Sequence, residues 1–319
     1  MKKTGLLLLL ILVGVASAQT NYAPAVAGNP EGTSANSDTF PTLRMETPTY
    51  SDLYCAGFVS KQLLPNANYV TGGLNTPNTT KFVNGDLIYL AGGGYQVGQQ
   101  YTVVRELKDP NQFELFDGQA KLMKQAGQPY AEQAHVRIVD TRSKMAIARV
   151  EFSCDPVNPG DFLIPYVDKK AIDPQQPHVF DRYLPASGRL GGRIILAKDF
   201  DSELGTGSKV YINLGTNQGV QVGEYFRAFR RYEEDLQNPV DSLSFKASVS
   251  EDTQKHPSST DQHMFTKTNG PQIHVHDMPR RSVGEIVIIG TTPTTATGMI
   301  TSSLEDVHVG DGVELEQQQ

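Results

Sequence analysis

The chain lacks tryptophan and carries few signals for helix. Its 319 residues include 29 Gly and 19 Pro but no Trp, a turn-rich balance. No stretch has the 3.6-residue apolar period of an amphipathic helix, whereas short strand-like runs recur between turn signals. Length and composition therefore predict an all-β chain with room for two domains, each burying its own core.

Clusters of basic residues are also scarce, which argues against nucleic acid as a partner. The chain has 28 Lys and Arg against 35 Asp and Glu. A surface for phosphates needs clustered Lys and Arg side chains. The short basic groups read as solvated strand edges and a loop end, namely Arg227, Arg230 and Arg231, and the pair Arg280 and Arg281.

The one long apolar run stands at the start of the chain. Lys2 and Lys3 precede apolar residues 6–15, and Ala-Ser-Ala at 16–18 fits a signal-peptidase site. The run is shorter than the roughly 20 residues that span a bilayer. We therefore predict a signal peptide over 1–18, no transmembrane segment in the mature chain, and export to the periplasm or cell surface of a Gram-negative-type bacterium.

Composition divides the remaining chain into four further segments. Residues 19–50 are rich in Pro, Gly, Ser, Thr and Asn without a hydrophobic period, which predicts a disordered linker. Strand-like runs fill 51–166 and 189–316, and the proline-containing residues 167–188 between them predict an interdomain linker. Within the second domain, the polar residues 232–281 predict a long loop.

The second domain repeats the order of the first. The phrase YQVGQ at 95–99 returns as VQVGE at 220–224, and VNPGD at 157–161 aligns without a gap with VHVGD at 307–311. Self-similarity at this spacing indicates duplication of a whole small domain.

These phrases share a tight-corner pattern, an apolar residue, two others, glycine and then a polar or acidic residue. Glycine takes a positive φ without a Cβ clash, and a carboxylate accepts hydrogen bonds from backbone N–H groups of the turn. The apolar residue three positions earlier would point into the core. The predicted structural turn residues are Gly98, Gly160, Asp161, Gly223, Glu224, Gly310 and Asp311.

An apolar-x-x-Gly-Asp corner before a strand, twice in each domain, resembles the GD-box of the cradle-loop family of small β-barrels. The stretches VYINLGTNQGVQVGEYFRAFR, VGEIVIIG and VHVGDGVEL also resemble the C-terminal domain of flagellar assembly T-proteins and of related LysM-associated bacterial envelope proteins. The resemblance covers about residues 190–316. It implies two small β-barrels in tandem and a place in the cell envelope.

The chain has only two cysteines, Cys55 and Cys154. In an exported protein two cysteines more often pair, and a disulfide here would close a loop of nearly a hundred residues around the first domain. Two buried thiols are the alternative, because Leu304 stands in place of Cys154 in the aligned second repeat.

Histidines concentrate in the predicted loop, at 256, 263, 274 and 276. On a strand, His274 and His276 would share one face and could bind Zn²⁺ or Cu²⁺ if a third ligand joined them. Polar loops also collect histidine without a ligand. They are weak candidates, so we expect no metal and no other cofactor.

No catalytic spacing emerges from the sequence. The glycines at 92, 94 and 98 miss the dinucleotide fingerprint, and residues 205–209 place Ser and Lys in the reverse order of a phosphate loop. A nucleophile elbow, a zinc helix and an acid-base signature are also missing. We expect a noncatalytic exported envelope protein that binds a protein partner or peptidoglycan. The alternative is a cell-wall hydrolase whose site no motif reveals.

The two domains differ in one connection. In the first domain residues 107–134 keep apolar side chains, among them Phe113, Leu115, Phe116 and Leu122, and are expected to pack against their own barrel. The corresponding loop of the second domain, 232–281, is polar over most of its length, which makes it a candidate contact surface.

Deleting residues 245–270 and joining the ends through a short Gly-Ser link should leave the second domain folded, because the cost of loop closure changes slowly with length. Circular dichroism and thermal melting should be unchanged while capture of the partner is lost. Loss of folding would place the segment in the core, and unimpaired capture would move the binding surface to the barrels.

Overall fold

The computed structural model describes residues 41–76, 78–110, 113–231 and 279–316, with backbone assignments also at 253–254 and 273–274. The predicted signal peptide, residues 19–40 of the predicted linker and the side chains of the loop histidines lie outside these residues. The described residues belong to one unit of the chain, Asn36–Gln319.

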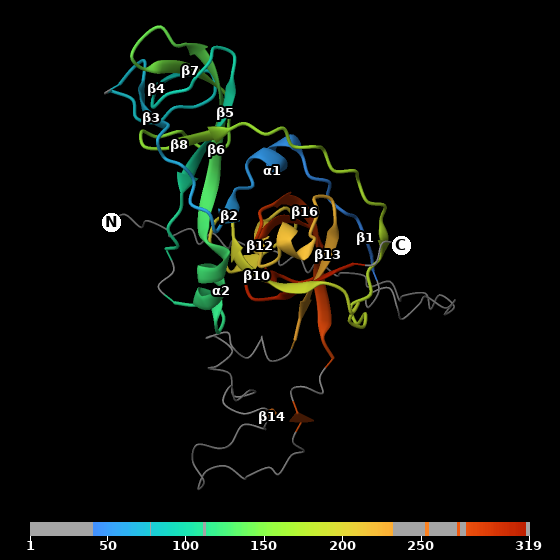
Figure 1. The fold of residues 1–319 in the computed structure, drawn as a ribbon. Helices are drawn as coiled ribbons and strands as arrows, with labels where there is room; N and C mark the ends of the chain where they lie inside the picture. Colours follow the sequence, from blue (N-terminus) through green and yellow to red (C-terminus); the bar gives the residue numbers. More distant parts are fainter. Residues whose placement is uncertain are drawn as a thin grey trace, which may run out of the picture. The chain divides into compact units, whose positions relative to one another are not determined.

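The first domain is a closed antiparallel barrel (Figure 1). Its strands follow the order β6-β5-β8-β3-β4-β7, and β7 pairs back with β6 to close the ring. A short strand, β2 (Phe58–Ser60), adds to β6 from outside the ring. The barrel strands are β3 (Tyr69–Gly73), β4 (Leu87–Ala91), β5 (Gln100–Glu106), β6 (Gln128–Asp140), β7 (Ala146–Ser153) and β8 (Phe162–Pro165).

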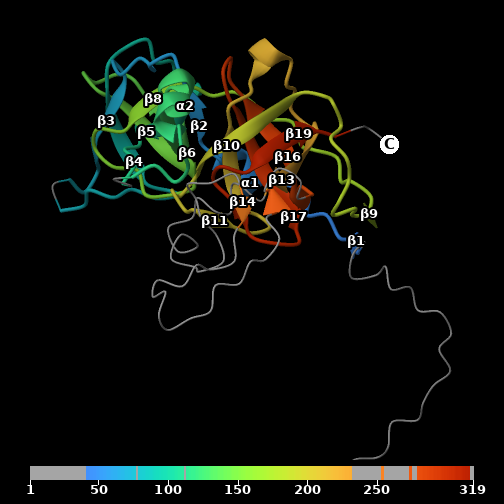
Figure 2. The same ribbon diagram turned by 90° about the horizontal axis from the view of Figure 1, so that it is seen from below.

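The second domain is also a closed barrel, in the order β10-β12-β17-β16-β13-β19 (Figure 2). Two small ladders accompany it, β11 (Glu203–Leu204) with β18 (Val307–His308), and β14 (Thr253–Gln254) with β15 (Ile273–His274). The prediction of two small all-β barrels in tandem is confirmed. The barrel strands are β10 (Gly191–Ala197), β12 (Lys209–Ile212), β13 (Tyr225–Arg230), β16 (Arg281–Thr291), β17 (Ala296–Ser303) and β19 (Gly312–Leu315), and the 3₁₀ turn η1 spans Thr216–Gln218.

The apolar run of β16 is continuous because both faces of this strand are buried. Ile286 and Ile288 point into the core of the second barrel. Val287 and Ile289 point outward and pack against Leu53 and neighbouring residues from the N-terminal part of the chain. A strand that is covered on both sides needs no polar face, which explains why its sequence does not alternate.

The predicted corners lie where the sequence placed them. Gly98, Gly160, Gly223 and Gly310 have φ values of 88°, 95°, 91° and 112°. The N–H of each donates to a carbonyl of a neighbouring strand, for example from Gly160 to Val70 at 2.8 Å. In this conformation a residue with a side chain is strained, so the positive φ favours glycine at each corner.

The acidic corner residues cap their own turns. Asp161 Oδ2 accepts a hydrogen bond from the N–H of Asn158 at 2.7 Å, and Asp311 Oδ2 accepts one from His308 at the same distance. Glu224 accepts from the N–H of Gln221 at 2.9 Å. The carboxylates therefore act as structural caps, as the pattern indicates.

The structure shows features of the repeat that were not predicted. Each barrel has a third corner, at Gly85 and Gly207, whose N–H groups donate to β-strand carbonyls at 2.8 Å. Each barrel also has an arginine that binds its corner aspartate through two nitrogens: Arg105 binds Asp161 at 2.7 Å and Arg230 binds Asp311 at 2.8 Å.

Part of the predicted disordered linker is ordered, which corrects the boundary at residue 50. β1 (Thr42–Leu43) pairs with β9 (His178–Val179), a strand of the predicted interdomain linker. The following helix α1 (Tyr50–Tyr54) begins at a capping box between Thr49 and Asp52. Composition missed this order because the segment is stabilised by contacts distant in sequence, including burial of Met45.

Two expectations about connections were wrong. The first-domain connection, which contains helix α2 (Gln119–Ala126), was expected to pack against its own barrel. Instead, Phe116 and Leu122 of this connection pack into clusters of the second barrel. The predicted loop 232–281 ends earlier than expected, because Arg281 already belongs to β16. Arg280, read as a solvated loop end, forms an ion pair with Glu314 at 2.6 Å.

The duplicated arginine–aspartate pair allows a matched test of burial. Arg230 and Asp311 expose 6% and 2% of their side chains, whereas Arg105 and Asp161 expose 31% and 4%. Asp311→Asn should lower the free energy of unfolding by about 3–5 kcal/mol, the usual cost of breaking a buried pair. Asp161→Asn should cost less, because water screens Arg105. Chemical denaturation of both variants checks this, and equal losses would contradict it.

Candidate functional site

The residues between α1 and β2 lie between the two barrels and form hydrogen bonds with both. The N–H of Gly57 donates to Glu132 Oε2 of β6 at 3.2 Å, and its carbonyl accepts from Thr297 Oγ1 of β17 at 3.1 Å. The carbonyl of Ala56 accepts from the hydroxyl of Tyr211 at 2.9 Å. This segment, residues 53–60, is called the joint below.

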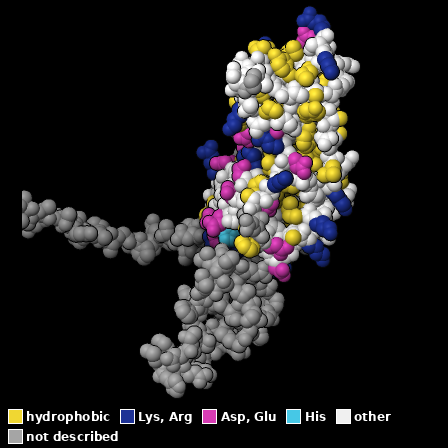
Figure 3. Space-filling view, turned by 90° about the vertical axis from the view of Figure 1, so that its left-hand side faces the viewer, with side chains coloured by type: hydrophobic (Ala, Val, Ile, Leu, Met, Phe, Trp, Pro, Cys, Tyr) yellow, Lys and Arg dark blue, Asp and Glu magenta, His cyan; other side chains and the backbone are white. Residues whose placement is uncertain are grey.

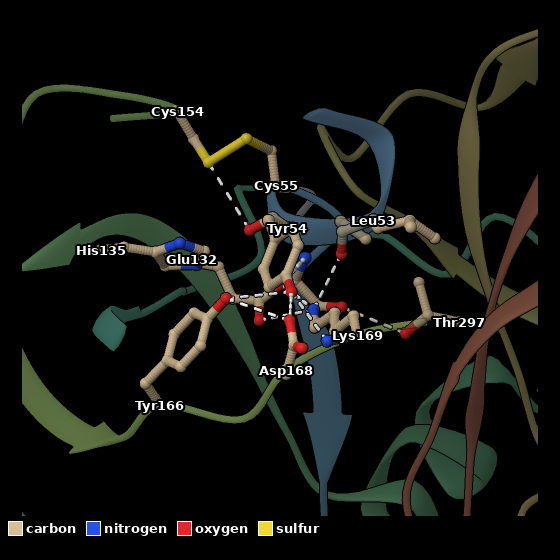
Figure 4. A network of polar contacts seen from close by, with 12 residues as sticks. Leu53, Tyr54, Cys55, Glu132, His135, Cys154, Tyr166, Asp168, Lys169 and Thr297 are labelled. Atoms are coloured by element: carbon tan, nitrogen blue, oxygen red, sulfur yellow. Dashed lines mark hydrogen bonds and ion pairs between the residues drawn. A yellow bond between two sulfur atoms is a disulfide. The ribbon is translucent and has the colours of Figure 1, made fainter. Parts of the chain in front are cut away.

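An ion pair between the partly exposed Lys169 and the buried Glu132 reinforces the joint (Figure 4). Lys169 Nζ donates to both oxygens of Glu132, at 2.7 and 2.9 Å, and to the carbonyl of Leu53 at 2.8 Å. Burial raises the pKa of Glu132, while Lys169 acts in the opposite direction. Tyr54 donates to Asp168 at 2.6 Å within the same network. These groups bind one another and help to hold the two barrels together. Their polar atoms therefore have little remaining capacity to bind a ligand.

Cys55 and Cys154 form a disulfide, with their Cα atoms 5.5 Å apart. It links Cys55, at the end of α1, to Cys154, which directly follows the last residue of β7. The pairing prediction is confirmed over the alternative of two thiols. Disulfides persist in oxidising compartments, so the bond is consistent with export. In the described ranges, no helix has the length and apolar character needed to cross a bilayer.

One surface of the molecule offers no large apolar patch. Figure 3 shows hydrophobic side chains interspersed with polar and charged ones on this face. Singly exposed apolar residues such as Leu63 and Val97 are common on protein surfaces.

A groove of about 950 Å³ lies between the interdomain residues and the second barrel. Residues 173–178 and 184–189 form one wall. The other wall is formed by the corner at Gly223 and Glu224, by the start of β13 and by the end of β19. Three prolines stiffen the interdomain wall. The apolar and aromatic lining residues are Pro174, Pro177, Pro185, Leu184, Leu315 and Tyr225.

His178, a half-buried residue that lines this groove, pairs with the buried Glu285 of β16. His178 Nε2 is 2.8 Å from Glu285 Oε1, and Glu285 is fully buried. The second oxygen of Glu285 has no hydrogen-bond partner among the described residues. Burial lowers the pKa of His178, but the charge of Glu285 and the hydrogen bond to it outweigh burial, and the pKa is raised overall.

A second carboxylate, Glu316, lines the groove itself. Burial and then the charge of Glu285 raise its pKa to about 7, while Arg227 and His178 act in the opposite direction. Arg227 Nη2 lies 3.3 Å from Glu316 Oε1, and its guanidinium lies 5.7 Å from the ring centre of Phe180. The groove therefore contains a carboxyl group that changes its charge near neutral pH.

Polar groups of the groove lack partners within the described structure. They are Gln175 Oε1 and Arg227 Nε, whereas Glu316 Oε1 is ion-paired with Arg227 Nη2. Buried polar groups are normally satisfied, and a set of unsatisfied ones in a groove indicates a site for a ligand or for water.

Most of the site residues that the sequence predicted do not lie in this groove. The corner residues are structural, although Gly223 and Glu224 also reach the rim of the groove. Arg227 and Arg230 were predicted to be solvated and are instead buried, because each faces a carboxylate of the C-terminal segment. His276 and the side chain of His274 lie outside the described residues.

Sequence reasoning missed His178, Glu285 and Glu316 because they come from three distant segments. One signal was present: Glu285 interrupts the apolar run VGEIVIIG, and a charge in such a run needs a buried partner. His178 has no comparable signal.

Within the residues that the structure describes, no three His, Cys, Asp or Glu side chains are arranged to hold a metal ion. No protein-family model matches the chain, and no curated protein matches it. The groove is therefore interpreted from its own chemistry.

The raised pKa of Glu316 predicts a pH dependence of stability. A carboxyl group with a raised pKa binds more protons in the folded than in the unfolded state between its ordinary pKa of 4.5 and about 7, so the fold loses stability as pH rises through this window. Relative to Glu316→Gln, which stays neutral, the wild type should lose on the order of 2–3 kcal/mol of unfolding free energy between pH 5 and pH 8. Denaturant titrations at both pH values check this. A difference between the two proteins that does not change with pH would refute it.

Proposed function

We propose that the protein is a noncatalytic, exported envelope protein that acts as a binding or assembly module for a protein partner or cell-wall glycan. The groove is the observation that carries this proposal. Its apolar walls surround a few polar groups that lack partners, the usual makeup of a ligand site.

The architecture supports a binding role. Two closed barrels, connected by a hydrogen-bonded segment that a disulfide ties to the first barrel, support the groove and the loops. The corner motif is similar to the GD-box of cradle-loop barrels. The second barrel is similar to domains of flagellar T-proteins and LysM-associated envelope proteins, which favours a periplasmic or surface location and peptidoglycan or an envelope protein as the partner.

A cell-wall hydrolase is the second candidate, and one observation favours it. Glycoside hydrolysis uses two carboxyl groups, one of them with a raised pKa, and Glu316 near Glu285 has that property. However, Glu285 is fully buried and bonded to His178, so it cannot reach a substrate in this conformation. The arrangement therefore fits binding better than hydrolysis.

Incubation of the purified protein with insoluble peptidoglycan tests both functions. A binding module should sediment with the polymer and release no soluble muropeptide, because the groove binds without cleaving a bond. Glu316→Gln serves as the control, since it would abolish release by an acid catalyst.

Release of muropeptides by the wild type but not by Glu316→Gln would establish the hydrolase instead. If the protein neither sediments nor releases product, the partner is a protein, which a pull-down from the native envelope would identify.

A further inference from the structure

Residues 173–178, the first half of the interdomain wall of the groove, run between two buried anchors. On one side, Ile172 packs in a hydrophobic cluster with side chains of β16 and β17. On the other side Phe180 is buried, and the carbonyl of Arg182 accepts from the N–H of Ser282 of β16 at 2.7 Å. Both ends of the stretch are therefore fixed, and the residues between them are the part of this wall that can separate from the second barrel.

The polar contacts of this stretch with the second barrel differ in strength. Asp173, Gln176 and both prolines are exposed, and a proline has no N–H to donate. The hydroxyl of Tyr225 lies 3.5 Å from the carbonyl oxygen of Asp173, which is long for a hydrogen bond. By contrast, His178 Nε2 lies 2.8 Å from Glu285 Oε1. The contact between His178 and Glu285 is therefore the one that holds the stretch to the barrel.

The hydrogen bonds of the His178 ring match its protonated form. Nδ1 lies 3.3 Å from the carbonyl oxygen of Gln176, and Nε2 faces the carboxylate of Glu285. Both partners are acceptors, so both ring nitrogens must donate, and only the protonated ring has two N–H groups. A neutral ring keeps one N–H group and no charge, so its bond to Glu285 is weakened or lost.

The position of this pair suits a group that responds to pH. The side chain of His178 is 21% exposed, which lets its proton exchange with water, whereas the side chain of Glu285 is fully buried. Burial lowers the pKa of His178, but the charge of Glu285 and the hydrogen bond to it raise this pKa overall.

Several other elements bring charged or titratable groups to this part of the groove. They are Glu285 of β16, Arg227 and Tyr225 of β13, and Glu316 after β19, with Asp173 and Arg182 on the segment itself. The paired strand β1 contributes Thr42 and Leu43, which do not titrate. Glu316 also titrates near neutral pH, because burial and then Glu285 raise its pKa to about 7. A test of His178 therefore needs a variant of Glu316 as a control.

We infer that His178 is a pH-dependent latch for the groove. The protonated ring holds residues 173–178 to the second barrel through Glu285, and when the ring loses its proton the stretch separates between its anchors and the groove widens. This device controls access to the groove and does not depend on which ligand the groove binds.

The direction of the response follows from the preference of the closed wall for the protonated ring. A histidine whose pKa is raised stabilises the closed wall fully below its ordinary pKa of 6.5, and this stabilisation is lost as pH rises through the raised value. The wall should therefore be closed at pH 5.5 and open more often at pH 8.

Fluorescence quenching tests the latch, because the chain has no tryptophan and Tyr225→Trp would place a single fluorophore in the groove. Quenching by acrylamide, an uncharged reagent, should increase about twofold or more from pH 5.5 to pH 8, as local opening exposes the indole. Adding His178→Gln keeps a hydrogen-bonding group that does not titrate, so quenching should no longer depend on pH. Tyr69→Trp, at an exposed position of the first barrel, is the control and should show no change with pH.

Glu316→Gln, added to Tyr225→Trp, separates the latch from the other group that titrates in this range. The pH dependence of quenching should persist in this double variant, because His178 and Glu285 are both retained. Equal quenching of Tyr225→Trp at the two pH values would overturn the inference. A pH dependence that survives His178→Gln, or one that disappears with Glu316→Gln, would also overturn it.

Hydrogen exchange of the wild type provides the test if Tyr225→Trp fails to fold. After correction for the intrinsic effect of pH on exchange, peptides that cover residues 173–178 should lose protection about threefold or more between pH 5.5 and pH 8. Peptides from β10, in the wall of the same barrel, should keep theirs. Unchanged protection of residues 173–178 would refute the latch.

Discussion

Two closed barrels have no free sheet edge to share, and this constraint determines how the rest of the protein is assembled. Neither ring extends its hydrogen-bond ladder into the other, so the barrels are connected by a segment outside both rings, whose strand β2 pairs with β6 of the first barrel. The joint at 53–60 fulfils this role because its backbone groups bond to Glu132 on one side and to Thr297 and Tyr211 on the other. An unmade buried hydrogen bond costs roughly 1–3 kcal/mol, so these bonds favour one arrangement of the two barrels.

The same constraint gives the interdomain residues a structural role. Their strand β9 pairs with β1 rather than with a barrel strand, and they lie against the second barrel, where Phe180 is buried and His178 bonds to Glu285. Their proline-rich stretch stands opposite β13 and β19, and the groove occupies the space between. A binding site thus arises from a connection rather than from a barrel interior.

Local rules allowed much of the fold to be predicted from the sequence. A corner such as Gly160-Asp161 is specified by its own residues, since the glycine supplies the positive φ and the carboxylate caps the turn. The duplication followed from the same residues. The third corners also fit the apolar-x-x-Gly-polar pattern, as FVNGD around Gly85 and LGTGS around Gly207, and they went unpredicted because neither begins with the valine of the other clear copies.

The candidate site depends on pairings between distant segments, and these have no local signature. Arg227 resembles any strand arginine until Glu316 is placed beside it. Likewise, Phe116 is an ordinary apolar residue of a connection, and only the assembled structure shows that it packs in the second barrel. Sequence order gave no means of predicting which barrel would receive it.

The pairing of β1 with β9 determines how the molecule would respond to mechanical tension. The chain enters at the second barrel, where the N–H of Glu46 bonds to the carbonyl of Thr301 at 2.9 Å, and it leaves through β19 of the same barrel. A force applied between the segment before residue 41 and the C-terminal end would therefore pass through the second barrel. The first barrel, although it lies between these points in the sequence, would remain outside the path of the force and keep its shape while its neighbour was stretched.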